Sequence, residues 1–109
     1  MERLKDKKVR QLLMLQGKKV TSRMMTLYFQ DNGLGITRYA IYSNKRLGGA
    51  VTRNRIKRLF REILNVSKGR LRGCDLIIVP RTEVSGMNGA QVRPYVLQQL
   101  LENGILLAG

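Results

Sequence analysis

The sequence predicts a small α+β domain in which helices pack on a short sheet, with the elements in the order α-β-β-α-β-α. Apolar residues recur at helical spacing in three segments, and runs rich in β-branched and aromatic residues lie between them. Turn-forming residues separate most of these segments. The 109 residues fit a single domain, spanning 1–109, which is long enough to bury one modest core.

The first predicted helix lies within "DKKVRQLLMLQG", residues 6–17. Val9, Leu12 and Leu13 fall on one of its faces, and Gly17 supplies a stop signal. The segment thus has the amphipathic pattern of a helix that covers a core.

The next segment, "VTSRMMTLYFQ" at residues 20–30, is rich in β-forming residues and predicts one strand. Side chains alternate between the two faces of a strand, so one face is expected to carry Met25, Leu27 and Phe29. The other face would then carry Met24, Thr26 and Tyr28. Asp31-Asn32-Gly33 follows the strand and predicts a hairpin-type turn.

The middle of the chain predicts a second strand and a long helix. The strand is expected over residues 35–43, and residues 47–51 form a glycine-containing loop. The loop leads into a helix over residues 53–66, with Thr52 as its N-cap.

The last third predicts a buried strand and a closing helix. "CDLIIVP", residues 74–80, is a nearly continuous apolar run that ends at Pro80. A helix is expected within residues 92–104. Pro94 is tolerable only near its first turn, and Gly104 lies past its end.

The charge balance predicts a polyanionic partner. The chain has 21 Lys and Arg against 7 Asp and Glu, a net charge of +14. Such an excess opposes compaction unless an anion neutralises it, and nucleic acid is the leading class of partner. An anionic membrane is the rival class, but no apolar run approaches the roughly 18 residues of a membrane span. No signal peptide is visible at the N-terminus, and the lone Cys74 suits a reducing compartment, so a cytoplasmic protein is expected.

The helix over residues 53–66 has two distinct faces. At about 100° per residue, its apolar side chains fall within an arc of about 140°; they are Ile56, Leu59, Phe60, Ile63 and Leu64. An adjoining arc of similar width carries Arg53, Asn54, Lys57, Arg58 and Arg61. Arg55 falls outside this cationic arc, near Glu62. Like charges stacked at 53, 57 and 61 cost stability unless an anion lies opposite, and the arginine fork suits phosphate oxygens.

These residues also carry a family resemblance. "KRLGGAVTRNRIKRLFRE", residues 45–62, resembles the signature of the bacterial ribonuclease P protein subunit, a small-residue loop followed by Arg-Asn-Arg and Lys-Arg on one helix. "LQGKKVTSRMMTLYF" and "CDLIIVPR" resemble other parts of that family's pattern, and the order of elements agrees. The chain departs from the family at several places. Val9 and Leu13 stand where two phenylalanines are usual, Tyr42 where a small residue is usual, and Pro94 where a helix has often begun. The family's Ser-Lys-Lys and Gly-Asn-Ala are replaced by Asn44-Lys45-Arg46 and Gly48-Gly49-Ala50.

The resemblance implies a function and a topology. Ribonuclease P hydrolyses one phosphodiester to remove the 5′ leader of precursor tRNA, and in bacteria its RNA subunit is the catalyst and uses Mg²⁺. The protein would be a non-catalytic component of this endonuclease, with the catalytic RNA and precursor tRNA as partners and no protein partner implied. The resemblance also implies a left-handed βαβ crossover, which runs against the usual rule.

The resemblance further assigns residues to two RNA surfaces. The signature helix and its loop would face the RNA subunit through Lys45, Arg46, Arg53, Asn54, Arg55, Lys57, Arg58 and Arg61. A cleft between the first helix and the sheet would take the single-stranded leader, with Val9, Leu13, Met24, Thr26, Tyr28 and either Ile77 or Ile78 as candidates. Tyr28 could stack on an unpaired base.

No set of residues in the sequence predicts catalysis by the protein itself. The chain has no His, and its acids are scattered over different segments rather than clustered as a two-metal nuclease requires. No zinc-ligand spacing or phosphate-binding glycine loop is present, so no metal ligand and no catalytic residue is predicted. Two other classes stay open: a basic ribosomal or RNA-chaperone protein without a role in tRNA processing, and a stand-alone nuclease or DNA-binding protein.

Overall fold

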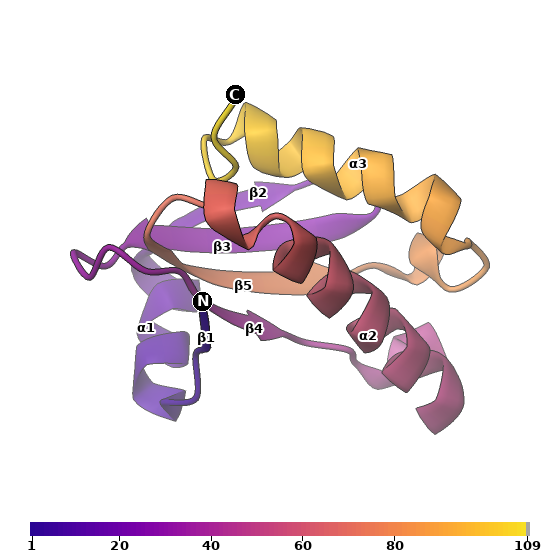
Figure 1. Cartoon of the computed structure of the whole chain (residues 1–109). Helices are drawn as coiled ribbons and strands as arrows, with labels where there is room; N and C mark the ends of the chain where they lie inside the picture. The colour runs from indigo at the N-terminus through magenta and orange to yellow at the C-terminus, as the bar shows by residue number, and fades with distance from the viewer. Residues whose placement is uncertain (109) are drawn as a thin grey trace.

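The structure, a computed structural model, describes residues 1–108 as a five-stranded sheet with three α-helices (Figure 1). The strands are β1 (Glu2–Arg3), β2 (Lys18–Thr21), β3 (Met25–Asp31), β4 (Arg38–Ile41) and β5 (Cys74–Pro80). The helices are α1 (Lys7–Gln16), α2 (Ala50–Val66) and α3 (Gly89–Glu102). Short 3-10 turns lie at Lys45–Leu47, Lys68–Arg70 and Thr82–Val84. None of the helices in this part of the chain has the length and apolar character that a membrane crossing requires.

The sheet is mixed, with the strand order β1-β4-β5-β3-β2. β5 lies at its centre, parallel to β4 and antiparallel to β3. Helix α2 connects the parallel neighbours β4 and β5. In Figure 1 both strands run from left to right, α2 lies in front of them and β5 lies above β4, so the crossover is left-handed. This confirms the topology that the family resemblance implied.

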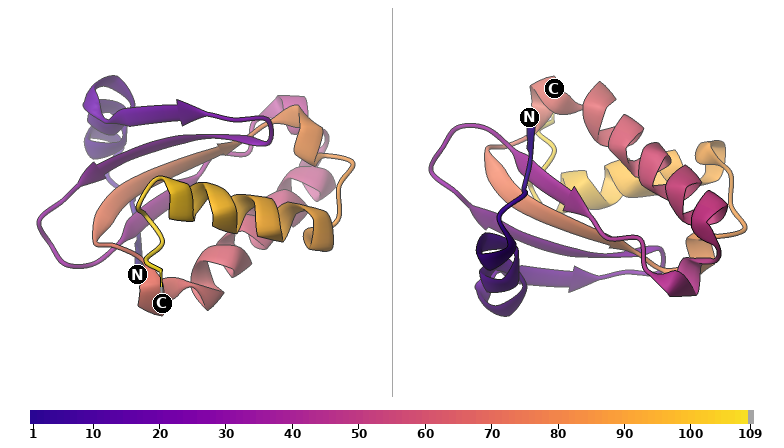
Figure 2. Two further views of the ribbon diagram at one scale, coloured as in Figure 1. Left: turned by 90° about the horizontal axis from the view of Figure 1, so that it is seen from above. Right: turned by 90° about the horizontal axis from the view of Figure 1, so that it is seen from below.

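The helices cover both faces of the sheet (Figure 2). Helices α2 and α3 pack on one face, where the main core gathers Met25, Leu27 and Phe29 of β3 with Leu76 and Ile78 of β5. The predicted placing of Met25, Leu27 and Phe29 on one face is therefore confirmed. The apolar stripe of α2 also enters this core, since Ile56, Phe60, Ile63 and Leu64 have no exposed surface.

Helix α1 packs on the opposite face over a smaller cluster. Its buried members are Leu4, Leu13 and Ile77. Asp6 caps the helix, because its carboxylate accepts hydrogen bonds from the backbone N–H groups of Lys8 at 2.9 Å and Val9 at 3.3 Å. Leu4 anchors the N-terminal segment beneath α1.

The prediction of one strand over residues 20–30 is wrong. The chain reverses at Ser22–Met24, and β2 and β3 form an antiparallel hairpin in which Val20 pairs with Leu27. Ser22 stabilises the turn, since its hydroxyl donates to the Met25 carbonyl at 2.9 Å. β-Forming side chains on both sides of the turn concealed it, because composition does not show where a chain reverses.

The predicted hairpin turn at 31–33 is also wrong, although Gly33 does adopt a positive φ of 69°. The turn connects β3 to β4, but β5 lies between these strands. The segment crosses the end of the sheet instead, and the Asn32 amide donates to the Ile36 carbonyl at 3.0 Å and to the Asp75 carboxylate at 2.9 Å.

Two helix starts differ from prediction. Helix α2 begins at Ala50 after Gly49, so Thr52 lies inside the helix and is not the N-cap. Helix α3 begins at Gly89, because Asn88 and Gln91 form a reciprocal capping box. Pro94 therefore lies in the second turn rather than the first. Gly104 follows the helix with a φ of 71°, as its predicted place past the end requires.

Candidate nucleic-acid interface

The polar arc of α2 forms a continuous cationic face. Arg53, Lys57 and Arg61 are half-buried along it, and Asn54 and Arg58 are exposed. A depression of about 270 Å³ lies among Asn54, Lys57, Arg58 and Arg61. None of these cations has an ion-pair partner among residues 1–108, so their charge is uncompensated. The Nε atoms of Arg53 and Arg61 are also buried without a hydrogen-bond acceptor.

The loop before α2 extends this face. Lys45 and Arg46 lie exposed in a short 3-10 turn, which the Asn44 side chain caps by accepting a hydrogen bond from the Arg46 N–H at 3.0 Å. Gly48 has a φ of 127°, which side chains rarely permit. Within the described residues no side chain caps α2, so its first N–H groups, at the positive end of the helix dipole, have no side-chain acceptor.

Arg55 lies apart from the cationic face and has protein partners. Its Nη2 donates to the Ser85 carbonyl at 2.9 Å, and its Nη1 to the Met87 carbonyl at 3.3 Å. Both acceptors belong to the segment that leads into α3. This position agrees with the helical geometry, which placed Arg55 outside the cationic arc and near Glu62. The Arg55 guanidinium connects α2 to the segment before α3.

The face of the sheet beside α1 carries the accessible candidates for the leader. Thr26 and Tyr28 of β3 are half-buried there, and Val9 of α1 packs against the same cluster. Lys19, opposite Tyr28 on β2, holds its ammonium 5.7 Å from the centre of the tyrosine ring. A ring with an adjacent cation is a suitable surface for an unpaired base and its phosphate.

The other leader candidates lie deeper or elsewhere. Leu13 of α1 and Ile77 of β5 are both buried, in the cluster between α1 and the sheet. Ile78 lies in the main core, so of the two alternating isoleucines only Ile77 belongs to the α1 face. Met24 is a second correction: it lies in the β2–β3 turn and packs into the main core, not beside Thr26 and Tyr28.

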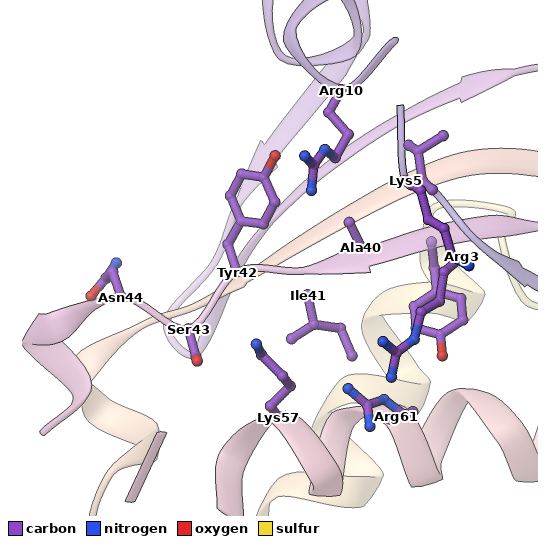
Figure 3. Close-up of a pocket in the computed structure, with 12 residues that line it drawn as sticks. Arg3, Lys5, Arg10, Ala40, Ile41, Tyr42, Ser43, Asn44, Lys57 and Arg61 are labelled. Carbon is purple, nitrogen blue, oxygen red and sulfur yellow. The ribbon is translucent and has the colours of Figure 1, made fainter. Parts of the chain in front are cut away.

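A cleft at the edge of β4 contains residues that the sequence did not indicate. Its volume is about 610 Å³, and Figure 3 shows it between α1, β4 and α2. Arg3, Lys5, Arg10 and Tyr42 line it together with Lys57 and Arg61. A two-residue strand such as β1 has no periodic signal, so Arg3 could not have been placed. In the strand predicted over residues 35–43, Tyr42 falls on the same face as Ala40, so alternation could have assigned Tyr42 to a face.

Asp75 is held in a hydrogen-bonded network with other side chains. Asp75 accepts hydrogen bonds from Arg38 at 2.8 and 2.7 Å and one from Asn32. Burial alone would raise the pKa of Asp75, but these hydrogen bonds outweigh it and hold the pKa below its ordinary value. Burial raises the pKa of the Cys74 thiol, which keeps it protonated. No group of three or more His, Cys, Asp or Glu in residues 1–108 could hold a metal ion.

Comparison with known sequences identifies similar proteins. A sequence family described as Ribonuclease P matches residues 1–103. The ribonuclease P protein component of Pelotomaculum thermopropionicum is 34% identical over 86 residues, which cover 78% of this chain and 77% of that protein. The corresponding component of Thermotoga maritima is 33% identical over 85 residues, covering 77% and 73% of the two chains.

Solved structures agree with the fold. A structure of the ribonuclease P protein of Staphylococcus aureus superposes with a TM-score of 0.87 at 29% identity, covering 97% of both chains. The Thermotoga maritima protein superposes with a TM-score of 0.85 at 29% identity, covering 94% of this chain and 97% of that one.

Proposed function

This chain belongs to the ribonuclease P protein family, and from that membership we propose that it is the protein subunit of a bacterial ribonuclease P. In this role it binds the catalytic RNA subunit and the 5′ leader of precursor tRNA in the cytoplasm. The holoenzyme then removes the leader by hydrolysing one phosphodiester. The protein contributes binding and orientation, and the RNA carries the chemistry.

The uncompensated cationic face of α2 is the observation that carries the proposal. Arg53, Lys57 and Arg61 project from one side of a helix whose other side is fully buried. The core therefore fixes the spacing of their backbone positions before any RNA arrives, so little backbone freedom is lost on binding. Lys45 and Arg46 lie before the N-terminus of α2 and add two more cations to this surface. We assign this surface to the phosphates of the RNA subunit.

The face of the sheet beside α1 is the proposed contact with the leader. Tyr28 offers a ring for an unpaired base, and Thr26 and Val9 lie next to it. Leu13 and Ile77 support this surface from below rather than touching RNA, since both are buried.

The Mg²⁺ that hydrolysis requires is assigned to the RNA. The described residues do not fit a metal site, because the cationic cleft has no carboxylate in its lining and Asp75 is already paired with Arg38. The protein would instead reduce repulsion between RNA phosphates, so the holoenzyme should need less magnesium than the RNA subunit alone.

Reconstitution tests the function directly. The protein should restore cleavage of precursor tRNA by a bacterial ribonuclease P RNA at a low magnesium concentration at which the RNA alone is inactive. The product should carry a 5′-phosphate on the mature tRNA. Failure to stimulate cleavage, with tight RNA binding retained, would favour a ribosomal or RNA-chaperone role. Cleavage without any added RNA subunit would identify a stand-alone nuclease.

Tyr28 provides a more specific test of the leader surface. Tyr28→Ala should weaken binding of precursor tRNA to the holoenzyme by about fivefold or more, the loss of one stacking contact, while binding of mature tRNA stays nearly unchanged. The ratio of the two affinities is the quantity to measure, because general misfolding lowers both. Equal losses would assign Tyr28 to packing.

A further inference from the structure

The outer edge of β4 is open where the 610 Å³ cleft crosses it. β1 pairs only with Arg38 and Tyr39, so β4 has no outer neighbour from Ala40 onward. Figure 3 shows Ala40 and Tyr42 pointing toward the α1 side of this edge and Ile41 toward the α2 side. The cleft therefore connects the face beside α1 with the cationic face of α2.

On the α1 side, Tyr42 offers an aromatic ring that the fold does not fully use. The residue is half-buried against the cluster around Ile77, and its hydroxyl has no hydrogen-bond partner within residues 1–108. The Arg10 guanidinium lies 5.8 Å from the ring centre. Arg10 itself has a buried Nε without an acceptor. This pairing of a ring with a cation has the chemistry that holds a nucleobase.

On the α2 side, cations converge from two distant segments. Arg3 and Lys5 come from the N-terminus, and Lys57 and Arg61 come from α2. In Figure 3 the guanidinium groups of Arg3 and Arg61 point toward one another. No Asp or Glu lines the cleft, and none of these cations forms an ion pair within the described chain. Such converging charges repel unless an anion lies between them.

The N-terminal segment is held in place for this role. The Glu2 N–H donates to the Thr37 carbonyl at 2.9 Å, and the Leu4 N–H donates to the Tyr39 carbonyl at 2.6 Å. Leu4 is only 3% exposed beneath α1. These contacts fix the backbone on both sides of Arg3, so the cationic side of the cleft is formed before a ligand binds.

We propose that this cleft binds one nucleotide of a single-stranded RNA, with its base stacked at Tyr42 and its phosphate held by Arg3, Lys57 and Arg61. The RNA must be single-stranded there, because a base inside a duplex has both faces covered by its neighbours. The inference rests on the proposed function, in which two RNAs meet the protein. The strand belongs either to the leader of precursor tRNA or to the RNA subunit, and both offer the same phosphodiester and base.

Variants of Tyr42 in the reconstituted holoenzyme test the base contact. Tyr42→Leu keeps apolar packing against Ile77 but removes the ring, and should weaken RNA binding by about fivefold or more. Tyr42→Phe keeps the ring and should bind as the wild type does. Melting temperatures of the free variants show whether each is folded. Tyr28→Leu on β3 is the matched variant for the other exposed ring on this face of the sheet.

The phosphate contact is tested through salt dependence. Arg3→Gln should reduce the slope of log affinity against log salt by about one unit, the loss of one phosphate contact. Lys68→Gln is the control, because Lys68 is exposed beyond the end of α2 and outside the cleft.

The two RNA sources give different outcomes. If the leader occupies the cleft, Tyr42→Leu and Arg3→Gln weaken precursor tRNA binding and spare both mature tRNA and the RNA subunit. If a strand of the RNA subunit occupies it, affinity for that subunit falls and the two tRNAs are affected equally. Unchanged affinity for all three RNAs, in folded variants, would overturn the site. The proposed function is judged separately, by whether the wild-type protein restores cleavage at all.

Discussion

Arg53 and Arg55 lie within one turn of α2 but contact different surroundings. Arg53 projects from the cationic face of α2, whereas Arg55 donates to the carbonyls of Ser85 and Met87. Neighbours in sequence lie about 100° apart around a helix, so two arginines of one motif can face different partners. A motif match alone treats them as equivalent, and the geometry does not.

We therefore expect different effects from substituting these arginines. Arg55→Ala should lower the melting temperature of the free protein, because it removes two hydrogen bonds between α2 and the segment before α3. The double change Arg53→Ala, Arg61→Ala should cost several-fold or more in affinity for the RNA subunit while stability changes little, since removing like charges relieves repulsion.

Calorimetry of the free proteins and RNA titrations separate the two effects. Lys57→Ala is a matched control that lies on the cationic face and should behave as the double variant does, with a smaller loss. The distinction fails if Arg53→Ala and Arg55→Ala lose equal RNA affinity with no change in stability.

Asp75 links pH to stability. Its side chain is 10% exposed and pairs with Arg38, and its pKa lies below the ordinary value of 3.8. Because the folded pKa is the lower one, the pair stabilises the fold above pH 3.8, and the stabilisation is lost as pH falls from there through the folded pKa.

The Asp75→Asn variant measures that contribution. At pH 7 it should be less stable than the wild type by about 1–3 kcal/mol, since the Arg38 fork loses a charged acceptor. Urea unfolding at a series of pH values should show the two proteins converging in acid. A constant difference from pH 7 to pH 3 would mean that the pair does not titrate with folding.

At the scale of an element, α2 is the part of the molecule that most clearly combines two functions. Its buried stripe, with Ile56 and Phe60, belongs to the core, and its polar arc holds cations at a fixed spacing. A helix whose polar face met only solvent would be more stable with charges of both signs along that face. The uniform sign on this arc is a cost to the free protein that a bound polyanion would offset.

Salt dependence provides the test at this scale. Arg58 is the exposed arginine of the cationic face, so Arg58→Ala should reduce the slope of log affinity for the RNA subunit against log salt by about one unit. The melting temperature should stay within the range of ordinary surface substitutions. An unchanged slope would place Arg58 on a merely solvated part of the face.

At the scale of the whole molecule, the excess of positive charge lowers the stability of the unbound protein. With 21 basic and 7 acidic residues, repulsion favours expansion, and only Arg38, Arg72 and Arg93 form ion pairs within the described residues. Anions that bind the folded surface should stabilise it by mass action.

The free protein should accordingly melt at a higher temperature in phosphate than in chloride at equal ionic strength. Screening is equal in the two buffers, but phosphate also stabilises folded proteins in general because it is excluded from their surface. The part of the difference that depends on the clustered arginines measures binding of the anion to them. Arg3→Gln and Arg61→Gln together should reduce this difference. Identical melting in both salts would indicate that no cluster on the folded surface binds phosphate.

The sequence by itself determined the α+β class, the two faces of α2 and the alternation of Met25, Leu27 and Phe29, because helical and strand periodicity are local. It also placed Arg55 away from the cationic arc for the same reason. The family signature indicated the left-handed crossover, which no periodicity encodes. The sequence also limited the candidate for the floor of the leader cleft to Ile77 or Ile78, since neighbouring strand residues face opposite sides.

Only the tertiary structure decided the rest. It reversed the chain at Ser22–Met24, inserted β5 between β3 and β4, and selected Ile77 for the face beneath α1. It also brought the N-terminal Arg3 to the same cleft as Arg61, through the pairing of β1 with β4. Strand pairing joins residues far apart in the chain, and no local pattern of residue types specifies which segments become neighbours.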